Sequence, residues 1–85
     1  MPAYATAWTA LADPTRRAIF ESLVDRPQVV GELAAQFPVS RPAVSQHLKV
    51  LKNAGLIRGE IDGPRVCYCI EPHVLRRLKA LVGSL

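Results

Sequence analysis

The sequence predicts one domain, residues 1–85, with a mainly helical α+β fold that carries a small β-hairpin near its C-terminal end. Three observations lead to this prediction. Apolar residues recur at helical spacing over most of the chain, prolines and glycines separate these segments, and two short strand-like runs flank a turn signal. At 85 residues the chain has the length of a single domain, and its own core must be small.

The first two expected helices meet at Asp13-Pro14. Proline suits the first position of a helix, and the preceding Asp13 suits its N-cap. One face of the first helix carries Tyr4, Trp8 and Leu11. The second helix is expected to run to about Val24, with a core face of Ile19, Phe20 and Leu23. Near its start, Arg16 and Arg17 are expected to be solvated or to have partners within the chain.

Two further helices are expected between Arg26-Pro27, which breaks the chain, and Gly55. The third helix is expected over about Val30 to Phe37, with a buried stripe of Val30, Leu33, Ala34 and Phe37. After a short turn, Ser40 suits the N-cap of the fourth helix, and Gly55 suits the left-handed position that ends it. The inward face of the fourth helix is expected to be Val44, Leu48 and Leu51.

A hairpin and a last helix complete the predicted order α-α-α-α-β-β-α. The runs "LIRGEI" and "RVCYCI" flank "DGP", which is a turn signal. Alternation along the second run places Cys67 and Cys69 on one face. The opposite face is expected to be Val66, Tyr68 and Ile70. From Pro72 onward an amphipathic helix is expected, with apolar residues Val74, Leu75, Leu78, Leu81 and Val82.

The net charge of +4 arises within one window of the chain. Between Pro38 and Gly59 there are basic residues and no acidic one, whereas the rest of the chain carries seven of each kind. The four basic residues of the window are Arg41, Lys49, Lys52 and Arg58. A local positive field of this kind favours a polyanionic partner. The alternative is a solvated helix face with a chance imbalance of charge.

The order of elements describes a winged helix-turn-helix, in which the fourth helix is the second helix of the motif. With Val44 facing inward and about 100° per residue, the side chains that point away from the core are polar or basic. They are Pro42, Gln46, Lys49 and Asn53, with Ser45 beside them and Arg41 at the helix start. Such a face suits a helix lying in the major groove of DNA.

Three segments, "LADPTRRAIFESL", "VGELAAQFPVSRPAVSQHLKVLKNAGLI" and "DGPRVCYCI", resemble the ArsR family of bacterial and archaeal winged-helix repressors over residues 11–70. The resemblance implies a homodimeric, cytoplasmic repressor that binds a palindromic operator and is often released by an effector. It also implies a set of DNA-binding residues: Ser40, Arg41, Pro42, Ser45, Gln46, His47 and Lys49 in the helix, with Arg58 and Arg65 in the hairpin.

These residues differ in what they can contribute. Gln46 and Ser45 are the best candidates for base contacts, since a glutamine amide pairs with adenine through two hydrogen bonds. Arg41 suits either a guanine or a phosphate, and Lys49 suits a phosphate because its charge sits on a flexible stem. For His47, a packed helix residue with one satisfied nitrogen and a phosphate contact are both open.

Neither of the family's usual metal sites has its ligands in this chain. The thiol site of the third helix falls on Val29-Val30-Gly31, and His73 is the only histidine for the site of the last helix. We therefore expect no metal and no cofactor. Cys67 and Cys69 keep open a metal- or thiol-responsive repressor, but two thiolates make an incomplete zinc site. Reduced and functionally inert cysteines are the favoured interpretation.

Other classes of protein find less support in the sequence. No acid–base or nucleophile–base arrangement is visible, so we do not expect an enzyme. No apolar run has the length of a membrane span, which favours the cytoplasm. A winged-helix module that binds protein or RNA remains the alternative from a different class, because fold alone does not give function.

Apolar residues at both ends of the motif predict a dimer. The three-helix core and the hairpin already use the other apolar residues, and exposed apolar patches mark interfaces. The expected dimer interface consists of Tyr4, Trp8 and Leu11 from the first helix, with Val74, Leu78, Leu81 and Val82 from the last.

Overall fold

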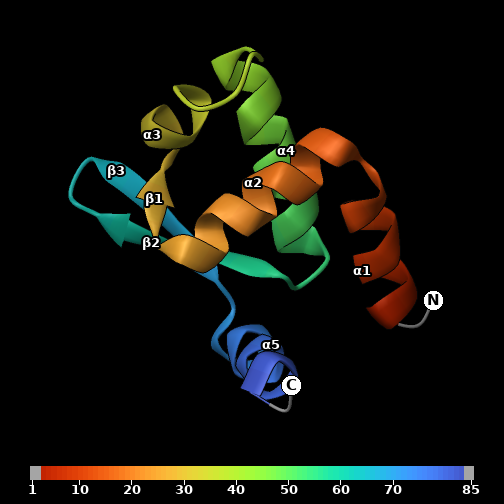
Figure 1. Ribbon diagram of the computed structural model, residues 1–85. Coiled ribbons are helices and arrows are strands. Elements are labelled where there is room, and N and C mark those ends of the chain that lie inside the picture. The colour runs from red at the N-terminus through yellow and green to blue at the C-terminus, as the bar shows by residue number, and fades with distance from the viewer. Residues whose placement is uncertain (1–2, 84–85) are drawn as a thin grey trace.

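The fold was obtained as a computed structural model, which describes residues 3–83 and the side chains of residues 6–83. Eight elements follow one another: α1 (Ala3–Ala12), α2 (Pro14–Asp25), β1 (Gln28–Val29), α3 (Val30–Ala34), α4 (Arg41–Asn53), β2 (Ile57–Asp62), β3 (Arg65–Ile70) and α5 (Pro72–Gly83). Figure 1 shows α1 to α4 gathered beside a small sheet, with α5 set apart from them. The predicted fold class, mainly helical with a β-hairpin wing, is confirmed.

Side-chain caps begin both long helices of the core, as the sequence predicts. Asp13 Oδ1 accepts a hydrogen bond of 2.9 Å from the backbone N–H of Arg16, and Pro14 occupies the first turn of α2. Ser40 Oγ accepts one of 3.2 Å from the N–H of Ala43 at the start of α4. After α4, Gly55 has a φ of 77°, a conformation that side chains with a Cβ rarely adopt.

Two arginines of α2 bind the end of α1. Arg16 Nε donates to the carbonyl oxygen of Ala10 at 2.5 Å, and Arg17 Nη1 donates to that of Leu11 at 3.1 Å. These carbonyls belong to the last turn of a helix, where they have no partner within the helix itself. The expectation of partners within the chain is confirmed for both residues.

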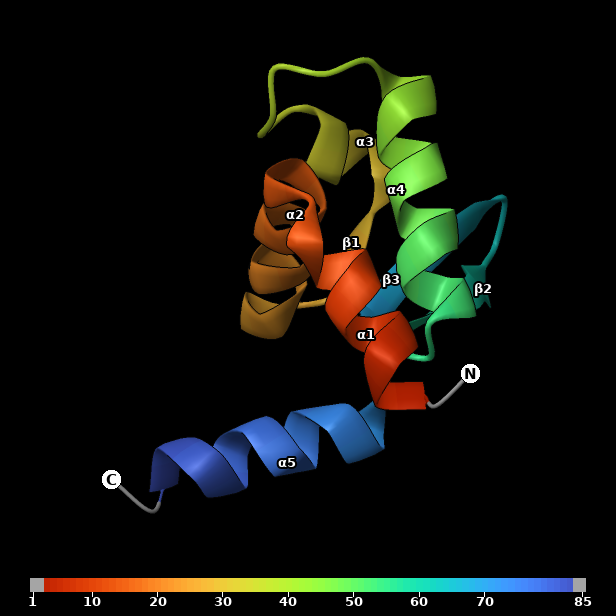
Figure 2. The same cartoon turned by 90° about the vertical axis from the view of Figure 1, so that its right-hand side faces the viewer.

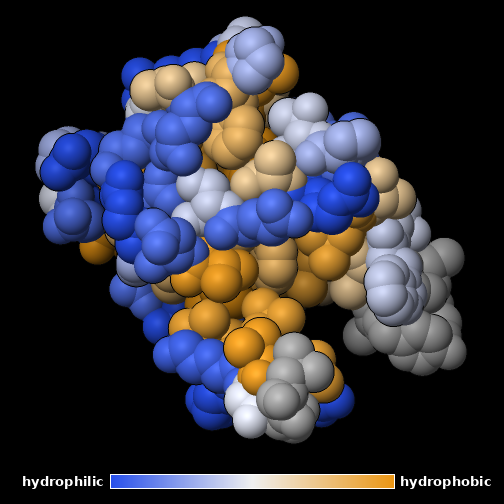
Figure 3. Space-filling view, viewed as in Figure 1, coloured by the Kyte–Doolittle hydropathy of each residue, from blue (hydrophilic) through white to orange (hydrophobic). Residues whose placement is uncertain are grey.

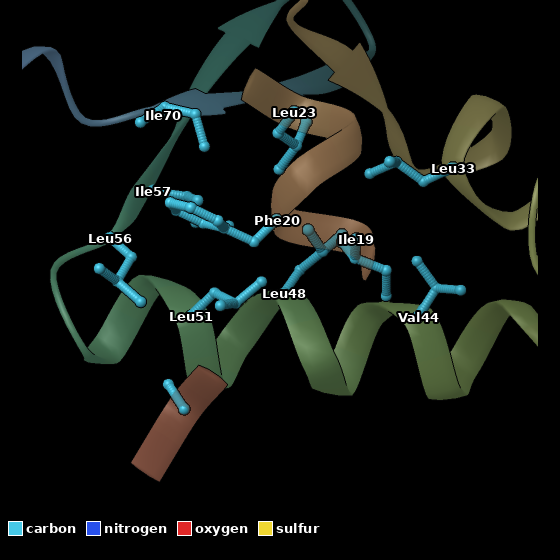
Figure 4. Close-up of a cluster of buried hydrophobic side chains, with 11 residues drawn as sticks. Ile19, Phe20, Leu23, Leu33, Val44, Leu48, Leu51, Leu56, Ile57 and Ile70 are labelled. Atoms are coloured by element: carbon cyan, nitrogen blue, oxygen red, sulfur yellow. The ribbon is translucent and has the colours of Figure 1, made fainter. Parts of the chain in front are cut away.

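The core lies between α2 and α4, and the sheet closes it (Figure 4). Residues from every layer are buried: Ile19, Phe20, Leu23, Leu33, Val44, Leu48, Leu51, Leu56, Ile57 and Ile70. Burying one such side chain contributes about 1.5–3 kcal/mol. Because Val44, Leu48 and Leu51 are fully buried on one side of α4, the rotation of this helix is fixed and its opposite side must face the solvent.

The sheet has three strands in the order β1-β3-β2, and both pairings are antiparallel. Gln28 pairs with Tyr68 across β1 and β3, and Ile57 pairs with Ile70 across β2 and β3. The sequence predicts the hairpin, whose turn contains Gly63 with a φ of 62°. The predicted order of elements is wrong in one respect, because it lacks β1. A strand of two residues has too few residues to show alternation, and it forms only because β3 offers a free edge.

Helix α3 is shorter than expected and ends at Ala34 instead of about Phe37. Phe37 precedes Pro38, and a residue before proline is disfavoured in the helical conformation. Of the expected stripe, Leu33 is fully buried, whereas Val30, Ala34 and Phe37 are partly buried against the core.

A buried amide joins three parts of the fold. The side chain of Gln28 is 2% exposed, and its Nε2 donates to the carbonyl oxygen and the hydroxyl of Ser22, each at 2.9 Å. Its Oε1 accepts a 2.6 Å hydrogen bond from Gln36 Nε2. These bonds connect α2, β1 and the segment after α3, so they fix where the chain enters the helix-turn-helix.

Helix α5 packs against the rest of the chain along part of one side only (Figure 2). Val74, Leu75 and Leu78 are half-buried against the core, while Leu81 and Val82 are exposed. None of its residues is fully buried. Over residues 3–83, no helix is both long and apolar enough to cross a membrane.

Candidate nucleic-acid interface

The exposed side of α4 carries the polar and basic residues that the sequence assigns to DNA. They are Arg41, Pro42, Ser45, Gln46 and Lys49, and all five are exposed. Ser40 is exposed too, and its hydroxyl caps the helix. The structure therefore places Pro42, Ser45, Gln46 and Lys49 on one side of one helix, opposite the fully buried leucines and valine, with Ser40 and Arg41 at the helix start.

His47 differs from its neighbours because it is half-buried. Its Nδ1 atom is shielded from solvent and has no hydrogen-bond partner among the described residues. Its ring lies near Asp13 at the start of α2 and is a lesser cause of the lowered pKa of that carboxyl, after the backbone hydrogen bond from Arg16. His47 thus lies at the border between the core and the exposed side of α4.

Arg41 does not extend along the exposed side of α4. Its Nη2 atom lies 3.6 Å from the position that a Cβ atom would take at Gly31, so the guanidinium folds back over the first turn of α3. There it lines a pocket of about 230 Å³ between α3, α4 and the tip of the hairpin. The other residues around this pocket are Val29, Val30, Ser45, Pro64, Arg65, Val66 and Tyr68.

The two wing arginines have different surroundings. Arg58 Nη2 makes an ion pair of 2.6 Å with Glu60 Oε1. The pKa of this guanidinium is raised, mainly by its contact with Cys69 and secondly by the charge of Glu60. Arg65 has no carboxylate within 4.0 Å among the described residues, and the same holds for Arg41. Arg65 therefore has the freer charge of the two for an anionic partner.

Arg65 contributes to the lowered pKa of Glu32, but this carboxylate has other hydrogen-bond partners. Glu32 Oε2 accepts from Arg26 Nη1 at 3.0 Å, and Oε1 accepts from the backbone N–H of Val29 at 3.1 Å. Both bonds lower the pKa of Glu32, and the backbone hydrogen bond from Val29 has the larger effect. The positive charge of Arg65 lowers this pKa slightly further. Glu32 is thus an ionised cap of α3 and does not neutralise the two arginines of the pocket.

Cys67 and Cys69 are both half-buried free thiols on β3. Burial, followed by the neighbouring Cys69, raises the pKa of the Cys67 thiol, and a raised pKa keeps a thiol protonated and unreactive. In the part of the chain that the structure describes, no three His, Cys, Asp or Glu side chains are grouped so as to hold a metal ion.

Sequence reasoning missed two features of this surface. The Arg41 guanidinium lies over Gly31 at the start of α3, and Tyr68 lines the same pocket as Arg41. The alternation of β3 placed Tyr68 on the inward face, but nothing in the sequence shows that Arg41 would turn toward the hairpin. Side-chain direction at a helix start depends on neighbours that are distant in the sequence.

Comparison with known proteins agrees with the geometry of the domain. Residues 13–58 match the family model described as "Bacterial regulatory protein, arsR family". The HTH-type transcriptional regulator Rv2034 of Mycobacterium tuberculosis is 58% identical over 73 residues, which are 86% of this chain and 68% of that protein. The HTH-type transcriptional repressor SmtB of the same species is 44% identical over 69 residues, which are 81% of this chain and 51% of that protein.

Solved structures give the same picture. A crystal structure titled as a possible transcriptional regulator for arsenical resistance superposes with a TM-score of 0.74 at 45% identity, covering 89% of this chain and 79% of that one. The homodimeric winged helix-turn-helix DNA-binding domain of Mb0332 from Mycobacterium bovis gives a TM-score of 0.83 at 29% identity, covering 96% and 76%. The chain thus spans about two thirds of the first curated relative, at 68%, and about half of the second, at 51%.

Proposed function

Because the chain belongs to the ArsR family of bacterial regulatory proteins, we propose that it acts in the cytoplasm as a homodimeric repressor on a palindromic DNA operator. The domain itself is that of a DNA-binding transcriptional regulator. The observation that carries the proposal is the exposed polar and basic side of α4, which the buried core holds in a fixed orientation. A helix presented in this way suits the major groove.

Contacts to DNA divide by chemistry. Gln46 and Ser45 reach base edges, since an exposed amide and a hydroxyl both donate and accept hydrogen bonds. Lys49 holds a phosphate as a point charge. Arg65, at the start of β3, adds a second positive charge from the hairpin, and Arg58 contributes less because Glu60 already pairs with it. His47 packs at the border between the core and the exposed side of α4, and it contacts DNA at the edge of the interface.

Dimerisation is supported by apolar surface on α1 and α5. Trp8 is 73% exposed, Leu81 67% and Val82 69%, which is unusual for side chains of this size. Trp8, Leu11 and Leu81 line a hollow of about 390 Å³ between the two helices, and Val82 lines another of about 340 Å³ beside α2. Figure 3 shows hydrophobic surface gathered between α2 and α5.

A second copy of the chain would cover this surface. Val74 and Leu78 are half-buried and so contribute both to the fold and to the interface. The exposed side chains of Leu81 and Val82 extend the interface. The side chain of Tyr4 lies outside the described side chains, so its part in the interface stays a prediction. Pairing about a two-fold axis would set two α4 helices about 34–36 Å apart, one turn of DNA, as a palindrome requires.

Selection of bound duplexes from a random library tests the proposal, followed by gel-shift titration of the winning sequence at several salt concentrations. We expect a two-fold symmetric consensus and an affinity that falls steeply with salt, because phosphate contacts release counterions. A duplex RNA of the same sequence serves as the competitor. Equal affinity for RNA and DNA, or no enriched consensus, would contradict the proposal.

A further inference from the structure

Two arginines from distant parts of the sequence line one small pocket. Arg41 begins α4 and Arg65 begins β3, yet both line the hollow of about 230 Å³ between the helix-turn-helix and the hairpin. Like charges repel, so their convergence has an energetic cost unless an anion lies between them. Within residues 3–83 no carboxylate lies within 4.0 Å of either guanidinium.

The pocket favours a small and highly charged group. Sites for drug-sized ligands enclose about 300–1,000 Å³, and this pocket is smaller. Ser45 lines the helix side of the pocket, and Tyr68 and Val66 line the hairpin side. Guanidinium groups bind phosphate through paired N–H donors, and they do so more strongly than neutral donors.

Arg41 is directed toward this pocket in the structure. Its Nη2 atom lies 3.6 Å from the place where a Cβ atom at Gly31 would be, so the guanidinium lies over α3 and lines the pocket together with residues of the hairpin. The same direction takes it away from the face on which Gln46 and Lys49 lie, so it is not placed to read a base.

We propose that this pocket is the binding site of one phosphate group, held by Arg41 and Arg65 together. This inference rests on the proposed function, since the phosphate is supplied by the backbone of the operator. The bound phosphate then joins α4 to the hairpin, and the two elements contact DNA as one unit. A free phosphate ion has the same chemistry, so the experiments must separate the two sources.

The first experiment uses the protein without DNA. Inorganic phosphate is titrated at constant ionic strength, set with chloride, while the backbone and arginine side-chain NMR signals are followed. We expect saturable shifts at Arg41, Ser45 and Arg65, and none in the Arg41→Ala variant. Arg76→Ala, which removes an exposed arginine of α5 outside the pocket, is the matched control and should respond as the unmodified protein does. Shifts that persist in Arg41→Ala would overturn the inference.

The second experiment uses operator duplexes in which one phosphate at a time is replaced by an uncharged methylphosphonate. One position per half-site should weaken binding at least about tenfold, the effect of losing charged hydrogen bonds. In Arg41→Ala and in Arg65→Ala, that same replacement should have no further effect. Sensitivity at two different positions for the two variants would show separate contacts and overturn the inference.

The variants also test whether the two arginines share one ligand. If they do, the double variant Arg41→Ala/Arg65→Ala should lose much less affinity than the product of the two single losses, because each single change already disrupts the site. Arg41→Lys keeps the charge but not the paired donors, so it should lose most of what Arg41→Ala loses. Fully multiplicative losses, with Arg41→Lys behaving as the unmodified protein, would contradict the pocket.

Failure of this inference can be distinguished from failure of the proposed function. If phosphate saturates the pocket but no methylphosphonate matters, the ligand is a free phosphate, and the site stands without its link to DNA. If operator binding is tight and salt-dependent but the two arginines act independently, the proposed function is supported and the shared phosphate site is overturned. If no operator is found, the titration with inorganic phosphate still decides whether the pocket binds this group.

Discussion

Gln46 and Lys49 lie three residues apart on the exposed side of α4, and they should affect DNA binding in different ways. Gln46→Ala should cost about 1–3 kcal/mol on the operator and relax the preference at one base position per half-site, since the amide reads a base edge. Lys49→Ala should weaken all sequences alike. Binding to a panel of single-base operator variants measures both effects. An unchanged base preference in Gln46→Ala, together with an altered one in Lys49→Ala, would reverse these roles.

The N-cap carboxylate of α2 makes stability depend on pH. The backbone hydrogen bond from Arg16 is the largest cause that lowers the pKa of Asp13 below its ordinary value of 3.8. A lowered pKa in the folded state gives stability that is present above 3.8 and is lost as pH falls through the folded value. Urea unfolding at fixed protein concentration should thus show a falling midpoint below pH 4 or so.

The Asp13→Asn variant isolates this contribution. Asparagine keeps an oxygen that can cap α2, but its amide does not titrate. The urea midpoint of this variant should therefore fall less between neutral and acidic pH than that of the unmodified protein. Some fall in the midpoint should remain, because the pKa of Glu32 is also lowered, by the N–H of Val29 and by Arg26. An identical slope with pH in both proteins would show that Asp13 does not contribute.

Among the elements, the helices that begin with a side-chain cap were predictable from the sequence. Asp13-Pro14 and Ser40 give local signals, and the apolar spacing of α4 fixed which of its sides is buried. That side determines the exposed one, so most of the candidate interface followed from α4 alone. The hairpin followed in the same way from its turn residues and its alternation.

What could not be predicted depends on contacts between distant segments. Strand β1 exists because Gln28 and Val29 meet the edge of β3, about forty residues later, which no local pattern of two residues reveals. The direction of Arg41 depends on how α3 and the hairpin lie around the start of α4, since its guanidinium lies over Gly31 and lines a pocket with residues of the hairpin. Both features are consequences of tertiary packing, and both lie beside the pocket between α4 and the hairpin.

The buried amide of Gln28 tests how strongly β1 and α3 are held. Gln28→Leu has a similar size but removes the bonds to Ser22 and Gln36, whose side chains, among the described residues, keep only the hydrogen bond to each other and the one from Gln36 to Glu32. The free energy of unfolding should fall by about 1–3 kcal/mol, as expected for such losses. Urea denaturation measures it. A midpoint equal to that of the unmodified protein would show that the network contributes nothing.

The thiols of β3 should not be needed for DNA binding. Cys67 has a raised pKa from burial and from Cys69, so it stays protonated, and serine replaces both thiols at similar size. Operator affinity of the Cys67→Ser/Cys69→Ser variant in reducing buffer should be within about twofold of the unmodified protein. If the unmodified protein were released by an oxidant or a thiophilic metal and this variant were not, the hairpin would be a sensor.

At the scale of the whole molecule, the apolar surface on α1 and α5 should depend on a second copy. Trp8 is exposed and Leu78 is half-buried, and a charged side chain at either position opposes burial of this surface. Trp8→Glu/Leu78→Glu should therefore give a poorly folded monomer with weak, non-specific DNA binding. Size-exclusion chromatography and circular dichroism report the two effects. Leu81→Glu is a milder control, because that side chain is 67% exposed and its change should spare the fold of the chain.

The most direct test of the central claim is the stoichiometry of the complex, measured by sedimentation of the unmodified protein with and without a palindromic operator. The account predicts a dimer at micromolar concentration and two chains on each operator, with weaker binding to a duplex that holds a single half-site. A monomer at that concentration that nonetheless binds the palindrome tightly, one chain at a time, would contradict the account.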